Sequence, residues 1–300
     1  MKTEDIKKIG VLGAGKMGHT IAAAASLKFP VVLKVRETGA KVTPDEARKR
    51  LSGCYPALVR RGKITEQQKE EALSRITITG RLEDLKDCQV VIDALPDDLK
   101  IKNETLSRLN GICPAQAIFT TTSSIFPITS LAAASGRPER FIGTHFCIPA
   151  HMMALVEVAP ALQTSQETVD VTMEFCKVLG KVPVACKDKP GFIVNYLFFP
   201  YLLAAVRALE AGLGTVEEID TAMKLGLGHP MGPFELLDMT GIDNVHSFAA
   251  IYEQLKDERF APPPLLYRME AAGYLGKLSG RGFYDYTRKD KDGKPKPMSF

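Results

Sequence analysis

The sequence predicts an α/β protein: a doubly wound, mostly parallel sheet with helices on both faces, followed by a second, all-helical domain. Short β-branched runs alternate with helical stretches from residue 7 to residue 185, which is the pattern of a parallel sheet. Beyond residue 191, helical periodicity replaces the strand signals. A chain of 300 residues is also long enough for two average domains. We expect the first domain to span residues 1–187 and the second to span residues 188–300.

Eight segments of the first domain have the composition of strands. Their β-branched and apolar residues favour an extended backbone between the turn signals that separate them. In chain order these segments read KKIGVLG, VVLKVR, RITIT, VVIDAL, AIFTT, RFIGTHF, LVEVA and KVPVAC.

The second domain contains signals for the start of helices. Thr215 and Glu218 form a TxxE capping box, and Pro233 suits the first turn of a helix. The final segment, residues 285–300, is polar and contains prolines, so we expect it to fray.

Composition disfavours several classes of protein. The 39 Lys and Arg against 35 Asp and Glu give a net charge of +4 without a block of like charge, so no nucleic-acid surface is expected. The six cysteines lack metal-ligand spacing, which predicts reduced side chains and no metal site. The charged N-terminus lacks a secretory apolar region, and the longest uncharged apolar stretch, residues 191–206, falls short of the ~20 residues that span a bilayer. We therefore expect a cytoplasmic protein that does not bind a membrane.

A glycine turn connects the first strand to the first helix. It reads Gly13-Ala14-Gly15-Lys16-Met17-Gly18, the GxGxxG pattern in the strand-to-helix context that a Rossmann-type dinucleotide site requires. Gly13 permits the tight turn, Gly15 lets the backbone approach a pyrophosphate, and Gly18 lets helix and strand pack closely. Lys16 and Met17 lie inside the same turn and are expected at the cofactor. The motif predicts a dinucleotide and does not identify the substrate.

The end of the second strand bears on which dinucleotide is bound. An acidic residue is expected there, about 20 residues after the glycine turn, to accept from the ribose 2′-hydroxyl. Val35 occupies that position, Arg36 follows it, and Glu37 comes later. Arg36 suits a 2′-phosphate and favours NADP, whereas Glu37 suits the free hydroxyl of NAD. Arg36 is alternatively a solvated side chain with no role at the cofactor.

A histidine and a glutamate suggest acid–base chemistry. His145 ends a predicted strand, at the edge of an α/β sheet where ligands bind, and Glu157 lies inside the apolar run LVEV. A buried carboxylate requires a partner, and a nearby histidine supplies one. Glu157 would hold one ring nitrogen of His145 and leave the other to take a proton, which makes a general base. Taken singly, each residue is more often structural or solvated.

At these residues the sequence resembles the L-3-hydroxyacyl-CoA dehydrogenase family, which includes the 3-hydroxybutyryl-CoA dehydrogenases. The resemblance runs from Lys7 to about Tyr286. It is carried by GTHFCIPxxxMxLVEV, with TTSSI before it and KDKPGFIVN, IDTAMKLGLGHPMGPFELLD and SGRGFYDY after it.

The resemblance implies a reaction and a set of site residues. The reaction is the reversible oxidation of a 3-hydroxyacyl-CoA to a 3-ketoacyl-CoA, with the hydride passing to NAD. The family's catalytic histidine and glutamate correspond to His145 and Glu157, and its loop serine and helix asparagine to Ser123 and Asn195. The resemblance also implies a homodimer through the helical domain. Without the resemblance, a helix N-cap explains one serine of the Ser123-Ser124 pair and a buried amide explains Asn195.

Basic residues and histidines near the predicted site have weaker signals. Lys63 closes the run LVRRGK, where the family places contacts to CoA, although such a run is more often a solvated helix end. We expect His19 on a helix surface and His151 in a structural role.

Three positions depart from the family pattern. Thr121 stands where family members usually have asparagine, Ile148 replaces the asparagine of HFFNP, and Val35 replaces the ribose acid. They are consistent with an unusual acyl group, a switched cofactor or lost activity. The alternative function is therefore a catalytically silent, crystallin-like member that binds a CoA thioester or a dinucleotide without turnover.

Overall fold

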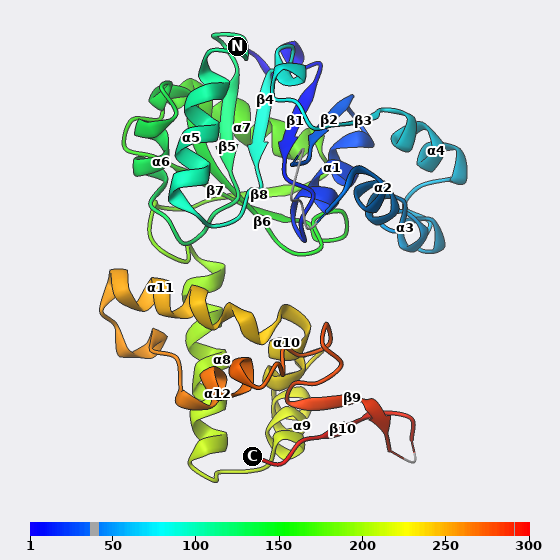
Figure 1. Cartoon of the computed structure of the whole chain (residues 1–300), viewed down its shortest axis with the longest axis vertical. Coiled ribbons are helices and arrows are strands. Elements are labelled where there is room, and N and C mark those ends of the chain that lie inside the picture. The colour runs from blue at the N-terminus through cyan, green and yellow to red at the C-terminus, as the bar shows by residue number, and fades with distance from the viewer. Residues whose placement is uncertain (37–41, 291) are drawn as a thin grey trace. The chain divides into compact units, whose positions relative to one another are not determined.

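The computed structural model describes residues 1–36, 42–290 and 292–300, and it divides into two compact units (Figure 1). The first unit is Met1–Phe192 and the second is Ile193–Phe300. The boundary expected from the sequence lies after residue 187. Glu37 lies outside the described residues.

The first unit is built on an eight-stranded sheet in the order β3-β2-β1-β4-β5-β6-β7-β8. Neighbouring strands are parallel except β6 and β7, which are antiparallel. All eight predicted strands form, and the strand order reverses at β1, as in a doubly wound fold. The strands are β1 (Ile9–Leu12), β2 (Val31–Lys34), β3 (Ile76–Thr79), β4 (Val90–Asp93), β5 (Ile118–Thr121), β6 (Phe141–Phe146), β7 (Leu155–Pro160) and β8 (Val182–Ala185).

Helices cover both faces of this sheet because successive strand residues point to opposite sides. On β4, Val90 and Ile92 join one apolar core while Val91 joins the other. The first core receives apolar side chains from α1 (Gly18–Ser26), α2 (Pro44–Ser52) and α7 (Gln166–Val178), and the second from α5 (Leu99–Asn110) and α6 (Ile128–Ala134). The excursion between β2 and β3 also holds α3 (Pro56–Arg60) and α4 (Glu66–Ser74).

The second unit is mainly helical, and two of its helices begin where the sequence predicts. Thr215 and Glu218 form the predicted capping box at the start of α9, and Pro233 is the first residue of α10. The helices are α8 (Val194–Glu210), α9 (Val216–Leu227), α10 (Pro233–Thr240), α11 (Val245–Leu255) and α12 (Pro264–Ala271). Within the described residues, no helix is both long and apolar enough to cross a membrane.

The expectation of a frayed C-terminal segment is wrong, and the second unit is not all-helical. β9 (Tyr284–Lys289) and β10 (Pro295–Pro297) form an antiparallel pair. The Tyr284 hydroxyl donates to the buried Asp220 carboxylate at 2.8 Å, and the Tyr286 hydroxyl donates to the buried Asp238 carboxylate at 3.0 Å. Asp238 also accepts from the Tyr284 amide. The tyrosines therefore anchor a strand whose other side chains are polar.

Candidate active site

The centre of the site is a histidine–glutamate pair on adjacent strands. His145 of β6 and Glu157 of β7 lie directly opposite each other in the antiparallel register. The His145 Nδ1–H donates to Glu157 Oε2 at 2.6 Å, and the two side chains are 14% and 1% exposed. The Phe192 ring packs at 5.7 Å from the imidazole. The strand register thus brings together the two residues that the sequence singled out.

This geometry selects one tautomer of the imidazole. Because Glu157 accepts from Nδ1, the lone pair of neutral His145 is on Nε2, and a proton taken there creates an imidazolium beside a carboxylate. Among the described residues, Nε2 of His145 has no hydrogen-bond partner. The pair has the arrangement of a general base with an orienting acid.

The serine loop follows β5, the strand next to β6. In the parallel register Thr121 is paired with Gly143, so Ser123 and His145 each lie two residues beyond that pair. Ser123 is only 3% exposed, and its Oγ accepts from the Ile125 amide at 3.5 Å and from the Phe126 amide at 3.4 Å. Ser123 does not cap α6, since Pro127 is the N-cap residue of that helix. The Ser123 oxygen therefore stabilises the turn between β5 and α6.

The adjacent Ser124 is half-buried and links the loop to the KDKPG segment. Its carbonyl accepts from the Gly191 amide at 2.8 Å. In the same segment the Asp188 carboxylate accepts from the Ile128 amide at 2.8 Å and the Thr129 amide at 2.9 Å. Asp188 therefore satisfies two orphan amides at the start of α6, where the helix dipole favours an anion.

The glycine turn has the geometry that the sequence predicts. Gly13 has φ +91°, and a Cβ on Gly18 would lie 1.8 Å from the Gly13 carbonyl oxygen, so neither position accepts a side chain. A Cβ on Gly15 would meet nothing within 4 Å. Gly15 therefore faces open space beside the N-terminus of α1, where amide groups and the helix dipole favour a pyrophosphate. These residues fit a dinucleotide.

The residues after β2 differ in exposure. Val35 is 2% exposed and packs in the first apolar core, whereas Arg36 is exposed. No carboxylate therefore occupies the position where a ribose acid is expected. Among the described residues at this strand end, Arg36 has an exposed charged side chain.

The environment of His19, next to the glycine turn, corrects one expectation. His19 is half-buried rather than on the surface, and its Nδ1 lies 2.5 Å from the Gly15 carbonyl oxygen. Burial, followed by the charges of His19 and Lys181, lowers the pKa of His151 to about 4. Burial, followed by the charge of the exposed Lys63, lowers the pKa of Lys181. Lys63 thus lies within electrostatic reach of this group.

Asn195 belongs to the second unit, where it is the second residue of α8. The geometry of the first unit brings together His145, Glu157 and the serine loop without it. The role of Asn195 remains a prediction from the resemblance.

A base with its orienting acid at the edge of a sheet that also carries a dinucleotide turn is what a nicotinamide-dependent dehydrogenase requires. The base takes the proton of an alcohol while the carbon gives up a hydride. Comparison with known proteins identifies the family. Residues 8–189 match the NAD-binding domain of 3-hydroxyacyl-CoA dehydrogenase, and residues 191–286 match its C-terminal domain. The chain belongs to the 3-hydroxyacyl-CoA dehydrogenase family.

Relatives in bacteria and mammals cover nearly the whole chain. A 3-hydroxybutyryl-CoA dehydrogenase of Mycobacterium tuberculosis is 41% identical over 95% of this chain and 100% of its own length. The mitochondrial hydroxyacyl-coenzyme A dehydrogenase of Mus musculus is 41% identical over 94% of this chain and 91% of its own.

Solved structures agree with the fold. M. tuberculosis FadB2 superposes with a TM-score of 0.89 at 40% identity, covering 94% of this chain and 99% of its own. The (S)-3-hydroxybutyryl-CoA dehydrogenase PaaH1 of Ralstonia eutropha superposes with a TM-score of 0.85 at 38% identity, covering 94% and 100%. The expected family, its two-domain fold and its nicotinamide cofactor are therefore confirmed.

Alanine substitutions at Gly15 and Gly18 should have different effects, one on dinucleotide binding and the other on stability. Gly15→Ala should leave the free energy of unfolding within about 0.5 kcal/mol of wild type, because its Cβ meets open space, yet weaken dinucleotide binding at least about 10-fold by blocking the pyrophosphate. Gly18→Ala should lower the free energy of unfolding by about 3 kcal/mol because of its backbone clash. Chemical denaturation and titration calorimetry measure both effects. Unchanged dinucleotide affinity in Gly15→Ala would contradict the assigned binding mode.

Proposed function

We propose that the protein interconverts a 3-hydroxyacyl-CoA and a 3-ketoacyl-CoA by hydride transfer to or from a nicotinamide cofactor. The observation that carries the proposal is the His145–Glu157 pair, with its 2.6 Å hydrogen bond and its buried carboxylate. Full-length similarity to 3-hydroxybutyryl-CoA dehydrogenases supports the choice of substrate class.

In the oxidation direction, His145 Nε2 takes the proton of the C3 hydroxyl. Glu157 keeps the imidazole in the required tautomer and stabilises the imidazolium that forms. The chemistry that the bound cofactor supplies is acceptance of the hydride from C3. In the reduction direction, His145 returns the proton to the oxygen.

The oxygens of the substrate need hydrogen-bond donors. The family resemblance assigns Ser123 and Asn195 to them. The Ser123 oxygen accepts from the Ile125 and Phe126 amides, which leaves the proton of its hydroxyl to donate to a substrate oxygen. Lys63, exposed in the turn after α3, suits a phosphate of CoA. Asn195 keeps the contact to a substrate oxygen that the family resemblance implies.

The cofactor is either NAD or NADP. Family resemblance supports NAD, while the buried Val35 and the exposed Arg36 support NADP. Ile148, 55% exposed, adds an apolar side chain three residues after His145 and is consistent with an unusual acyl group.

The catalytic pair predicts a specific loss of activity. His145→Ala should lower kcat/KM for the reduction of acetoacetyl-CoA by about 10²- to 10⁴-fold because the proton donor is removed. Glu157→Gln should lower it at least about 10-fold because the carboxylate that selects the tautomer is lost. Oxidation of the reduced nicotinamide, followed by absorbance, measures both.

The second unit offers a matched control. His246 and Glu270 form a pair of the same 2.6 Å length, but His246 is 70% exposed, so His246→Ala should keep the wild-type rate. If the wild-type protein binds acetoacetyl-CoA yet consumes neither reduced cofactor with any of several 3-ketoacyl-CoA thioesters, the catalytically silent alternative replaces the proposal.

Arg36 predicts a change in cofactor preference. Arg36→Ala should weaken NADP binding about 10-fold and leave NAD binding within about 2-fold, because only NADP carries the 2′-phosphate that a guanidinium holds. Calorimetry with each cofactor measures this, and Arg108→Ala on α5 serves as the exposed-arginine control. An equal loss of affinity for both cofactors would show that Arg36 does not read the 2′ position.

We also propose a homodimer formed by the second unit. Leu197, Leu213, Leu225 and Leu227, on or beside α8 and α9, are 67%, 80%, 83% and 66% exposed. Exposed apolar side chains that lie close together commonly mark an interface, and these four lie on or beside two consecutive helices. Light scattering should give about twice the 32.8 kDa chain mass, and the double variant Leu225→Glu/Leu227→Glu should shift the mass towards the monomer. A wild-type protein that stays monomeric at micromolar concentration would rule the dimer out.

A further inference from the structure

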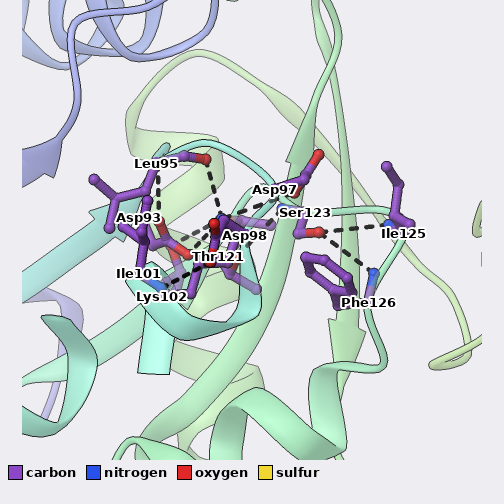
Figure 2. Close-up of polar contacts among 12 residues, drawn as sticks. Asp93, Leu95, Asp97, Asp98, Ile101, Lys102, Thr121, Ser123, Ile125 and Phe126 are labelled. Carbon is purple, nitrogen blue, oxygen red and sulfur yellow. Dashed lines mark hydrogen bonds and ion pairs between the residues drawn. The ribbon is translucent and has the colours of Figure 1, made fainter. Parts of the chain in front are cut away.

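A buried ion pair lies at the carboxyl ends of β4 and β5 (Figure 2). Lys102 of α5 and Asp93 of β4 are both 0% exposed, and Lys102 Nζ lies 2.9 Å from Asp93 Oδ2. Lys102 also donates to the Leu95 carbonyl at 3.1 Å, and the Leu95 amide donates to Asp93 Oδ1 at 2.9 Å. The catalytic steps described above do not use these charges.

Thr121 connects this ion pair to the serine loop. Its hydroxyl donates to Asp93 Oδ2 at 2.9 Å, and the same oxygen accepts from the Ser123 amide at 3.3 Å. Thr121 is itself 0% exposed. Because the threonine proton is directed to the carboxylate, its lone pairs are left for the Ser123 amide. Ser123 then accepts from the amides of Ile125 and Phe126, which continues the chain of hydrogen bonds through the loop, as Figure 2 shows.

The same cluster adjoins the dinucleotide turn. Asp93 precedes Ala94, whose amide donates to the Leu12 carbonyl at 3.0 Å. A Cβ on Gly13 would lie 2.8 Å from the Ala94 carbonyl oxygen, so the end of β4 packs against the first glycine of the motif. The end of β4 therefore joins the two segments, since its backbone packs against the cofactor turn and the Asp93 side chain is hydrogen-bonded to Thr121 of the serine loop.

A buried charge is stable only with its partner, which makes such a network rigid. Asp93 receives hydrogen bonds from three groups, Lys102 Nζ, the Thr121 hydroxyl and the Leu95 amide, in a region closed to water. A displacement of Thr121 would leave one acceptor position of the carboxylate empty. The position of the loop is thus tied to a buried carboxylate that accepts from three groups.

We infer that Thr121, held by the Asp93–Lys102 pair, is a positioning residue that sets the serine loop against the dinucleotide turn for hydride transfer. The inference rests on the proposed function, since it assigns the loop to the substrate oxygen. Rates fall steeply when a contact to the reacting group is misplaced by about 1 Å, so the hydroxyl of Thr121 should matter for turnover although it touches no substrate.

Two variants separate this role from packing, because valine has nearly the shape of threonine without its hydroxyl, and serine has the hydroxyl without the methyl group. Thr121→Val removes the hydroxyl and should lower kcat for acetoacetyl-CoA reduction about 10-fold or more, with a smaller change in KM. Thr121→Ser retains the hydroxyl and should keep kcat within about 3-fold of wild type. A folded Thr121→Val protein with wild-type kcat, or a Thr121→Ser protein as slow as Thr121→Val at equal Tm, would overturn the inference.

Amide exchange tests the same point independently of activity. In Thr121→Val the Ser123 amide loses its acceptor, so deuterium uptake in a peptide covering residues 120–128 should rise, while Thr121→Ser should resemble wild type. Unchanged uptake in Thr121→Val overturns the inference even when the wild type is active. Raised uptake with a wild type that turns over no thioester would refute the proposed function and leave the positioning contact intact.

A second substitution covers the case in which Thr121→Val does not fold. The double variant Asp93→Val/Lys102→Met removes both charges together with the oxygen that accepts from Thr121, so no unpaired buried charge is left. It should lower kcat at least about 10-fold and raise loop exchange. Wild-type kcat in the folded double variant would overturn the inference.

Discussion

The site depends on the requirement that a buried carboxylate have a partner. Glu157 is 1% exposed, and the antiparallel register of β6 and β7 places His145 directly across from it, so the pairing is fixed by the backbone before any ligand arrives. Charge burial is costly unless hydrogen bonds compensate for lost hydration. The same contact that stabilises the carboxylate leaves one ring nitrogen of the histidine to exchange a proton. The stability of the strand pair and the proposed role of His145 as a base thus depend on one interaction.

The same constraint operates two strands away. Asp93 ends β4 and is neutralised by Lys102, which is buried on the first turn of α5. Both carboxylates lie in the sheet of the first unit, and the serine loop leaves β5, the strand between β4 and β6. The loop therefore lies between β4, which carries the buried Asp93, and β6, whose His145 is paired with the buried Glu157 of β7. Parallel strands bring their carboxyl ends to one edge, which is why residues far apart in the sequence meet there.

Part of this arrangement could be predicted from local patterns, and part could not. The eight strands, the glycine turn and the His145–Glu157 pair have signals that depend on neighbouring residues. Asp93 and Lys102 were missed, although a signal exists: Lys102 lies four residues before Leu106 and seven before Leu109, on the apolar stripe of its helix. The order of the C-terminal segment could not be predicted locally. It depends on hydrogen bonds from Tyr284 and Tyr286 to Asp220 and Asp238, which are distant in the chain.

By itself, the sequence determined the class of fold, the dinucleotide turn, the family and the candidate base, because periodicity and glycine spacing are local properties of the chain. Only the tertiary structure decided that Ser123 is buried within its turn, that Val35 belongs to the apolar core, and that Thr121 joins the serine loop to a buried ion pair. The physical reason is that burial and hydrogen-bond partners depend on which strands and helices pack together. A residue's neighbours in space are set by strand order and register, which no short segment specifies.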